Sequence, residues 1–272
     1  MPAPASSGVE RGIRVAAAFA SDPFEAVERA RDQIAERRER RRTLPSYDAD
    51  AAWAETLRKT IGAGRDAADE FDDVWRGVEA AFARKQLPFG RGAFGGWDDG
   101  DPALARAAWY VVRELRPGVV VETGVGRGVT TRVILEALSR NGDGHLWSID
   151  VPPLLERGLA DETAAVVPAS HRNRWTFIRG SSRRRLRPLL AQLGDIDVFL
   201  HDSFHSARNL LFEWEAAFAR LRRPGVLLAD DVHRNAALAE FTRAHPSFER
   251  IVCRHDDGFE LFAVLVRSNN GS

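Results

Sequence analysis

Apolar residues recur with two different periods along the chain, and the change between them predicts an α/β fold behind a helical N-terminal segment. Between residues 22 and 88 the apolar positions return every three or four residues, as in amphipathic helices. From residue 102 onward, helical patterns alternate with short runs rich in Val, Ile and Leu, which are typical of strands buried on both faces of a parallel sheet. Residues 1–21 have no sustained period, so we expect a loose tail there.

The segment 22–88 is predicted to be a helical appendage. Its first helix is predicted to start from Asp22-Pro23. We expect the appendage to pack on the core or on a second subunit, or to form a lid that is part of the wall of a substrate site, and these roles are compatible. Contact with a second subunit would make the protein a homo-oligomer. The apolar positions of its three helices are Phe24, Val27, Ala30 and Ile34, then Trp53, Leu57 and Ile61, then Phe71, Val74, Trp75, Val78 and Phe82.

Residues 89–101 form a glycine-rich loop that contains three aromatic residues, Phe89, Phe94 and Trp97. A plain linker has no need of large apolar side chains. A flap that closes over a ligand needs both the hinges and the apolar cover, so we interpret the loop as a flap, with a linker as the alternative.

Seven strands are predicted after residue 102, and the last two form a hairpin. The resulting fold class is α/β, with a seven-stranded, doubly wound, Rossmann-like sheet. Helices are expected at 103–115, at about 154–165 and near 236–244. The predicted strands are 119–121, 146–150, 175–178, 196–202, 226–229, 248–253 and 258–266.

A glycine turn follows the first of these strands. Glu122 ends the strand, Gly124, Gly126 and Gly128 follow, and a helix continues to a C-cap at Asn141-Gly142. Because glycine has no Cβ, such a turn lets backbone N–H groups approach a ligand closely. The dinucleotide fingerprint requires its third glycine three residues after the second, whereas here the spacing is two. The spacing therefore argues against a nucleotide-binding oxidoreductase.

This turn resembles the first motif of the class I S-adenosylmethionine (SAM) dependent methyltransferases, E/D-x-G-x-G-x-G. The resemblance covers about residues 102–267 and implies a SAM-binding methyltransferase domain at 102–272. In that family the glycine turn passes the methionine part of SAM, and an acid ending the second strand binds the ribose. Asp150 lies 22 residues beyond Gly128 and matches that acid. Ser181 and Ser182 follow the third strand, where the family lines the adenine, although either could instead cap the next helix.

Five acids stand at the carboxyl ends of predicted strands, where open α/β sheets bind their ligands: Glu122, Asp150, Asp202, Asp230 and Asp231. If the fourth and fifth strands are neighbours, the last three converge on one point. Carboxylates at such short distances repel one another unless a cation neutralises them. A set of ligands that are all oxygen atoms favours Mg²⁺. We therefore predict a divalent cation held by Asp202, Asp230 and Asp231.

The same residues resemble the metal-dependent small-molecule O-methyltransferases, which carry an Asp at the end of the fourth strand and an Asp-Asn or Asp-Asp pair 28 and 29 residues later. This sequence has Asp231 where Asn is common in that family. Asp202 and Asp230 have the 28-residue spacing, and His205 lies where the family places its general base. The resemblance implies that a metal and His205 together activate an acceptor hydroxyl. The sequence motif His201-Asp202-Ser203-Phe204-His205 resembles a poorly characterised branch of the methyltransferases more than it resembles the metal-dependent enzymes. A metal-independent enzyme, a catalytically silent SAM-binding module, or purely structural acids and histidines remain alternatives.

Charge and cysteine content limit the classes of binding partner and the cellular location that we expect. Equal numbers of basic and acidic residues, 39 each, produce no net field toward nucleic acid or anionic membranes. The arginine run of residues 36–42 is interleaved with Glu, which indicates a solvated helix face. A lone Cys253 excludes a disulfide framework and favours a cytoplasmic location, and no apolar run reaches the length of a membrane span. The expected partner is a small-molecule acceptor whose identity the sequence leaves open.

Overall fold

The computed structural model describes residues 22–39, 41–62, 66–151 and 157–268. The predicted tail at 1–21 and the first part of the helix predicted at 154–165 lie outside these ranges. None of the helices in the described ranges is long and apolar enough to cross a membrane.

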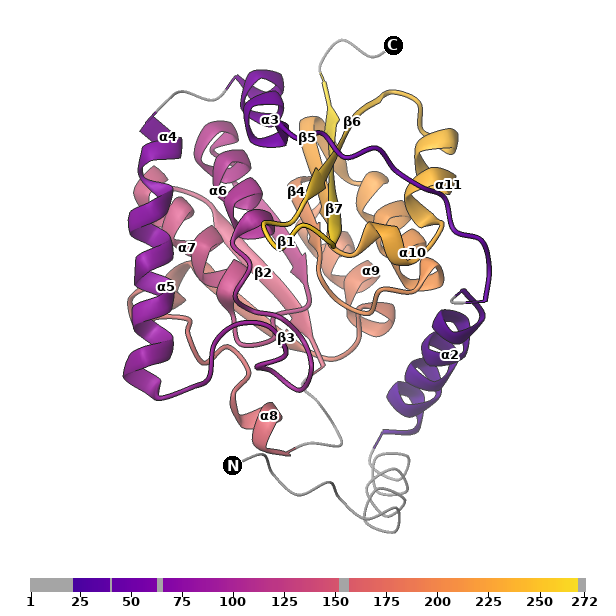
Figure 1. The fold of residues 1–272 in the computed structure, drawn as a ribbon, viewed down its shortest axis with the longest axis horizontal. Helices are drawn as coiled ribbons and strands as arrows, with labels where there is room; N and C mark the ends of the chain where they lie inside the picture. The colour runs from indigo at the N-terminus through magenta and orange to yellow at the C-terminus, as the bar shows by residue number, and fades with distance from the viewer. Residues whose placement is uncertain (1–21, 40, 63–65, 152–156, 269–272) are drawn as a thin grey trace.

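The seven predicted strands form one sheet with the order β3-β2-β1-β4-β5-β7-β6, which confirms the α/β prediction (Figure 1). Neighbouring strands are parallel except β7, which runs antiparallel to both β5 and β6. The predicted final hairpin is therefore present. The strands are β1 (Val119–Thr123), β2 (His145–Asp150), β3 (Trp175–Arg179), β4 (Ile196–His201), β5 (Leu221–Ala229), β6 (Phe248–Arg254) and β7 (Leu261–Arg267).

Helices cover both faces of the sheet because successive strand residues point to opposite faces. Val120 and Leu200 enter the core beneath α6 and α7, whereas Val121 and Phe199 enter the core beneath α9, α10 and α11. The helix predicted at 103–115 is present with those bounds. The helices that cover the two faces of the sheet are α6 (Ala103–Leu115), α7 (Val129–Asn141), α9 (Ser182–Leu193), α10 (Ala207–Phe218) and α11 (Ala237–Ala244). The shorter ones are α8 (Arg157–Asp161), η1 (Ala169–Arg174) and η2 (Val232–Arg234), so the described part of the helix predicted to reach residue 165 ends at Asp161.

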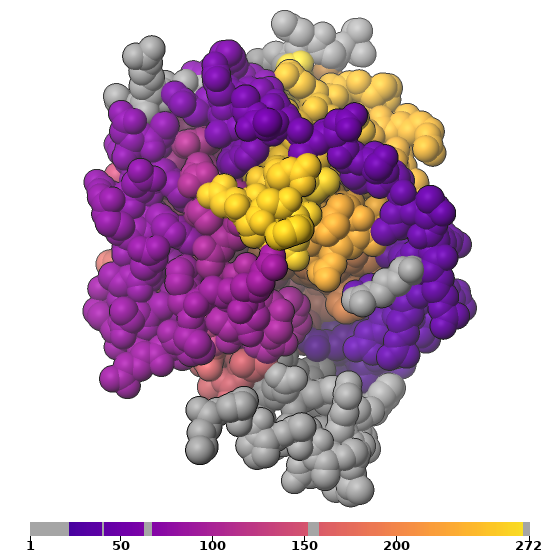
Figure 2. Space-filling view, viewed as in Figure 1, coloured from indigo at the N-terminus to yellow at the C-terminus, as the bar shows by residue number. Residues whose placement is uncertain are grey.

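The N-terminal appendage divides between the two faces. Helices α3 (Trp53–Ile61), α4 (Asp66–Asp69) and α5 (Phe71–Lys85) lie on the α6–α7 side, where Leu57 and Phe82 are buried in the core. Helix α2 (Pro23–Glu39) lies on the other side, against α10. The segment between them runs along the edge strand β6, where the Asp50 N–H donates to the Val252 carbonyl at 2.9 Å. The chain therefore wraps the C-terminal strands from α2 round to α5 (Figure 2).

Helix α2 docks through its polar face, the reverse of the usual orientation of an amphipathic helix. Its buried side chains include Glu25, Glu28 and Asp32, whereas Phe24, Val27 and Ile34 are exposed by 47%, 39% and 47%. The cause lies in what α2 meets. Arg208 of α10 pairs with Glu28 at 2.7 Å and with Asp32 at 2.6 Å, and the Ala207 N–H donates to Glu39 at 3.0 Å. Carboxylates beside the N-terminus of α10 also complement its dipole.

Candidate active site

The predicted site residues gather at one edge of the sheet, where β1, β2, β4 and β5 end. Glu122 is the penultimate residue of β1, Asp150 ends β2, Asp202 follows β4 and Asp230 follows β5. Since β1 and β4 are neighbours, as are β4 and β5, these acids are brought close together. The sheet thus assembles the site from residues that are up to about 100 positions apart, as sequence analysis predicts.

Packing within the protein requires glycine in this turn, in addition to the space that a ligand would need. All three glycines have positive φ, at +86° for Gly124, +50° for Gly126 and +88° for Gly128. A Cβ on Gly124 would lie 1.8 Å from the carbonyl oxygen of Asp202. Gly124 therefore allows the turn after β1 to contact the end of β4, which places the turn directly beside the acid cluster.

Asp150 is fixed by the same turn. Its Oδ2 accepts hydrogen bonds from the N–H groups of Val125 and Gly126, each at 3.2 Å, and burial raises its pKa. The carboxylate is held where β2 meets the turn, the place expected for an acid that binds the ribose of SAM. Its assignment to the ribose stays a prediction.

Glu122 lies behind the turn and is 1% exposed. Its Oε2 accepts hydrogen bonds from Ser148 at 2.6 Å and from Thr131 at 2.8 Å, whereas its Oε1 has no hydrogen-bond partner among the described residues. Desolvation raises the pKa of Glu122 to about 7. A buried carboxylate oxygen without a donor fits the ammonium group of the SAM methionine, so the residues present suit the cofactor.

This pKa leads to a pH prediction. The affinity of the chain for S-adenosylhomocysteine (SAH) should rise about tenfold between pH 6 and pH 8, because a Glu122 with a pKa near 7 becomes a full counter-ion only above that pH. In Glu122→Gln the affinity should be low and should not change with pH over that range. Calorimetric titrations of both proteins at several pH values measure this. A rise of equal size in the variant would assign the pH dependence to another group.

The predicted flap loop lies over the glycine turn and is fastened by a residue of the turn itself. Arg127 is 3% exposed and donates to the carbonyl groups of Pro88 at 2.6 Å and Ala93 at 3.1 Å. Its guanidinium carbon also lies 4.9 Å from the centre of the buried Phe94 ring, and Trp97 remains 54% exposed. Sequence analysis did not select Arg127, although an arginine between two motif glycines was the available signal. The loop is placed as a flap would be, and its movement stays a prediction.

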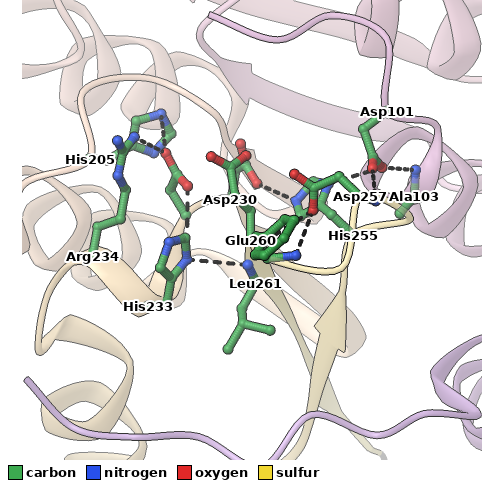
Figure 3. Close-up of polar contacts among 12 residues, drawn as sticks. Asp101, Ala103, His205, Asp230, His233, Arg234, His255, Asp257, Glu260 and Leu261 are labelled. Atoms are coloured by element: carbon green, nitrogen blue, oxygen red, sulfur yellow. Dashed lines mark hydrogen bonds and ion pairs between the residues drawn. The ribbon is translucent and has the colours of Figure 1, made fainter. Parts of the chain in front are cut away.

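The acid cluster contains a histidine that sequence analysis missed. His255, just after β6, lies between two carboxylates, with its Nε2 2.9 Å from Asp230 and its Nδ1 3.0 Å from Asp101 (Figure 3). Burial alone would lower the pKa of His255, but its bonds to Asp101 and Asp230 outweigh burial and raise that pKa to about 11. His255 is therefore a cation at neutral pH and holds the pKa of Asp230 below its usual value.

Asp202 lies in the middle of the cluster. Burial and the neighbouring charge of Asp230 raise the pKa of Asp202 well above its ordinary value. One ligand atom from each of Asp202, His205 and Asp230 can be chosen so that all three lie within 4.8 Å of one another, close enough to hold a metal ion.

Asp231 was predicted to be a metal ligand, but it is not among the three residues that the structure groups closely enough to share one ion. Its φ of +53° turns the backbone into the left-handed region, and its Oδ2 pairs with Arg234 at 2.6 Å. The same oxygen lies 3.7 Å from the Nε2 of His205. The three groups that the structure brings together therefore include His205 in place of Asp231. The sequence could not indicate this left-handed turn, which Asp tolerates better than most residues.

His205 has an Nδ1 without a hydrogen-bond partner among the described residues, and its side chain is 18% exposed. Burial lowers its pKa. His205 is therefore neutral at neutral pH and able to accept a proton.

A second buried group missed by sequence analysis holds the loop that presents these residues. Glu213 of α10 is fully buried; its Oε2 lies 2.6 Å from the Nδ1 of His201 and accepts a bond from Thr123 at 2.5 Å. Its Oε1 accepts bonds from Ser203 at 2.8 Å and from Asn209 at 2.9 Å. One carboxylate thus fixes the chain on both sides of Asp202.

Comparison with known proteins agrees with this architecture. Residues 121–232 match the family model of a methyltransferase domain. The O-methyltransferase of Bacillus cereus in complex with SAH has 15% sequence identity and a TM-score of 0.53, over 72% of this chain and 91% of that one. TomG of Streptomyces achromogenes, an O-methyltransferase of tomaymycin synthesis in complex with SAM, has 16% identity and a TM-score of 0.52, over 72% and 90%.

A putative O-methyltransferase from Klebsiella pneumoniae has 16% identity and a TM-score of 0.51, over 80% of this chain and 96% of that one. No curated protein matches the chain in sequence. The similarities in structure establish the fold, and the family match covers the glycine turn, Asp150 and Asp202 through Asp231. Residues 121–232 therefore match a methyltransferase domain, and the strand order of the surrounding sheet agrees with the fold of these O-methyltransferases.

Proposed function

We propose that the chain transfers the methyl group of SAM to an oxygen of a small-molecule acceptor, and that His205 removes the proton of that oxygen. The observation that carries this proposal is the contact between the glycine turn and the acid cluster, where Gly124 packs against the carbonyl of Asp202. This contact places the glycine turn, where SAM is proposed to bind, beside the residues proposed to act on the acceptor. SAM already carries an activated methyl group, so the protein has to align the acceptor oxygen and remove its proton.

Each residue has a separate task in this proposal. Glu122 pairs with the ammonium group of SAM and Asp150 with its ribose hydroxyls. The flap loop excludes water from the methyl group, because its Phe94 ring covers Gly126 and would lie 3.6 Å from a Cβ at that position. Asp202 orients the acceptor hydroxyl by a hydrogen bond, and neutral His205 accepts its proton through Nδ1 or Nε2.

Basic groups of the protein could compensate the negative charge of the acid cluster without a metal ion. The sequence argument for a cation rests on mutual repulsion among Asp202, Asp230 and Asp231. In the folded chain His255 lies against Asp230 and Arg234 against Asp231, while the raised pKa of Asp202 favours its neutral form. These contacts support a metal-independent reaction as the leading proposal.

A metal-assisted reaction is the second candidate, and the grouping of Asp202, His205 and Asp230 favours it. A bound divalent ion would lower the pKa of the acceptor hydroxyl. His205 would then be a ligand and could not serve as the base. An imidazole in the set also suits Mn²⁺ or Zn²⁺ better than the Mg²⁺ expected from oxygen ligands alone.

Chelation distinguishes these candidates. SAM and a panel of phenolic, sugar and aliphatic hydroxyl compounds are incubated with the chain, and SAH is measured before and after removal of divalent ions. We expect SAH formation to continue after chelation, because His255 and Arg234 already pair with Asp230 and Asp231. Loss of turnover that Mn²⁺ or Mg²⁺ restores would support the metal-assisted reaction. Binding of SAH without turnover on any acceptor would instead indicate a silent SAM-binding module.

A further inference from the structure

Helix α2 reaches the ends of the two strands that are expected to hold the adenosine part of SAM. The Oε1 of Glu25 accepts a hydrogen bond from the Ser181 N–H at 2.9 Å, at the end of β3. One turn further along α2, the Nη2 of Arg29 donates to the carbonyl of Val151 at 2.9 Å, directly after Asp150. The helix therefore contacts the ribose side and the adenine side of the predicted pocket together.

Glu25 keeps one oxygen unused in this arrangement. The residue is 5% exposed, and its Oε2 is buried with no hydrogen-bond partner among the described residues. The Oγ of Ser181 is also buried without a partner among those residues, and although Ser181 precedes α9, its side chain makes no capping bond. Buried polar atoms are rarely left unpaired in folded proteins, so two such atoms on residues in direct contact indicate a missing polar group.

The charge around Glu25 shows which kind of group is missing. The guanidinium of Arg29 acts electrostatically on both Asp150 and Glu25. A carboxylate beside a guanidinium accepts hydrogen bonds and donates none. The missing group must therefore be a donor. Adenine carries one suitable donor, its exocyclic 6-amino group, and the rest of its edge consists of acceptors.

We propose that Glu25 binds the 6-amino group of the SAM adenine, so that the N-terminal helix completes the cofactor pocket and selects adenine over a 6-oxo purine. This inference rests on the SAM dependence of the proposed function. Oε1 stays on the Ser181 N–H, and Oε2 accepts the amine. A 6-oxo base would place a carbonyl oxygen against the carboxylate, where two acceptors repel each other.

The test compares two ligands that differ only in the base, SAH and its deaminated analogue S-inosylhomocysteine. Calorimetric titration of the wild-type chain should show SAH binding roughly 100-fold more tightly. Glu25→Gln keeps the shape and an acceptor for the Ser181 N–H but adds an amide donor. It should weaken SAH roughly 10- to 100-fold and reduce the preference over the 6-oxo ligand at least tenfold, because the amide can donate to the carbonyl.

Glu36→Gln is the matched control. It makes the same change on the same helix, 11 residues further on and therefore about 16 Å along its axis, and it should leave both affinities at wild-type values. Melting temperatures of all three proteins show whether α2 remains docked.

Three results would overturn the inference. Equal weakening of both ligands in Glu25→Gln would mean that Glu25 serves only to fasten α2 to the start of α9. Tighter SAH binding in the variant would mean that α2 obstructs the pocket rather than completing it. Absence of SAH binding to the wild-type chain would contradict the SAM assignment itself, a failure recognisable because it precedes any comparison of variants.

Discussion

Replacing His205 by alanine is expected to lower the rate of methyl transfer by about 10²- to 10⁴-fold, the usual contribution of a positioned general base. SAH affinity should be preserved, since the role proposed for His205 is to remove the proton of the acceptor oxygen and not to bind the cofactor. In the wild type the rate should rise with pH through the pKa of His205, which burial lowers, and this rise should be missing in the variant. Single-turnover rates at several pH values, with SAH titrations on the same preparations, measure both effects.

His245→Ala is the matched histidine control. His245 pairs with Glu215 at 3.0 Å and packs on Phe218 at the end of α10, away from the acid cluster. Its removal should lower the melting temperature and leave the pH profile unchanged. If His205→Ala behaves like this control, with a residual rate that follows only the folded fraction, His205 is a packing residue and the mechanism loses its base.

Gly124→Ala is expected to destabilise the fold by at least about 4 kcal/mol, with loss of SAH binding. Two costs add together. An alanine at a φ of +86° costs about 1–2 kcal/mol, and its Cβ would lie 1.8 Å from the Asp202 carbonyl oxygen, so the turn after β1 and the end of β4 would have to separate. Urea unfolding of the variant and the wild type measures the difference in free energy.

Gly142→Ala separates the two costs. Gly142 caps α7 with a similar φ of +78°, but a Cβ there would meet no atom within 4 Å. It should cost only about 1–2 kcal/mol, the backbone term alone, and SAH should still bind. Similar losses in the two variants would mean that the contact between the glycine turn and Asp202 relaxes without difficulty.

The order of helices and strands was predictable because each follows from a local period. The run Val119 to Val121 indicated a buried strand, and the helix from residue 103 begins after Asp101-Pro102 and ends before Pro117-Gly118. The convergence of Glu122, Asp150, Asp202 and Asp230 followed from the strand order of a doubly wound sheet. These features depend on short stretches of sequence and one topological rule.

The parts that escaped prediction depend on partners distant in the chain. The face of α2 that packs is set by Arg208 and by the Ser181 N–H, more than 150 residues away. Apolar spacing could not indicate that Glu25 and Glu28 would be the buried side. His255 becomes a cation only because Asp101 and Asp230 meet on either side of it, and no local pattern marks that meeting.

The predicted need for a metal shows the same limit. Three acids at the right spacing suggest a missing positive charge, but the sequence does not show that His255 and Arg234 supply charge from within the protein. The carboxylate of Asp231, at a left-handed turn, also pairs with Arg234. Electrostatic arguments from sequence therefore need the positions of the basic groups as well as the acids.

Methyl transfer by this chain requires SAM to bind at the glycine turn, and one calorimetric comparison tests this binding directly. The purified chain is titrated with SAM and, separately, with NAD under the same conditions. We predict one SAM bound per chain, with affinity lost in Asp150→Ala, and no binding of NAD. Binding of NAD in preference to SAM, or SAM binding that Asp150→Ala leaves unchanged, would contradict the account.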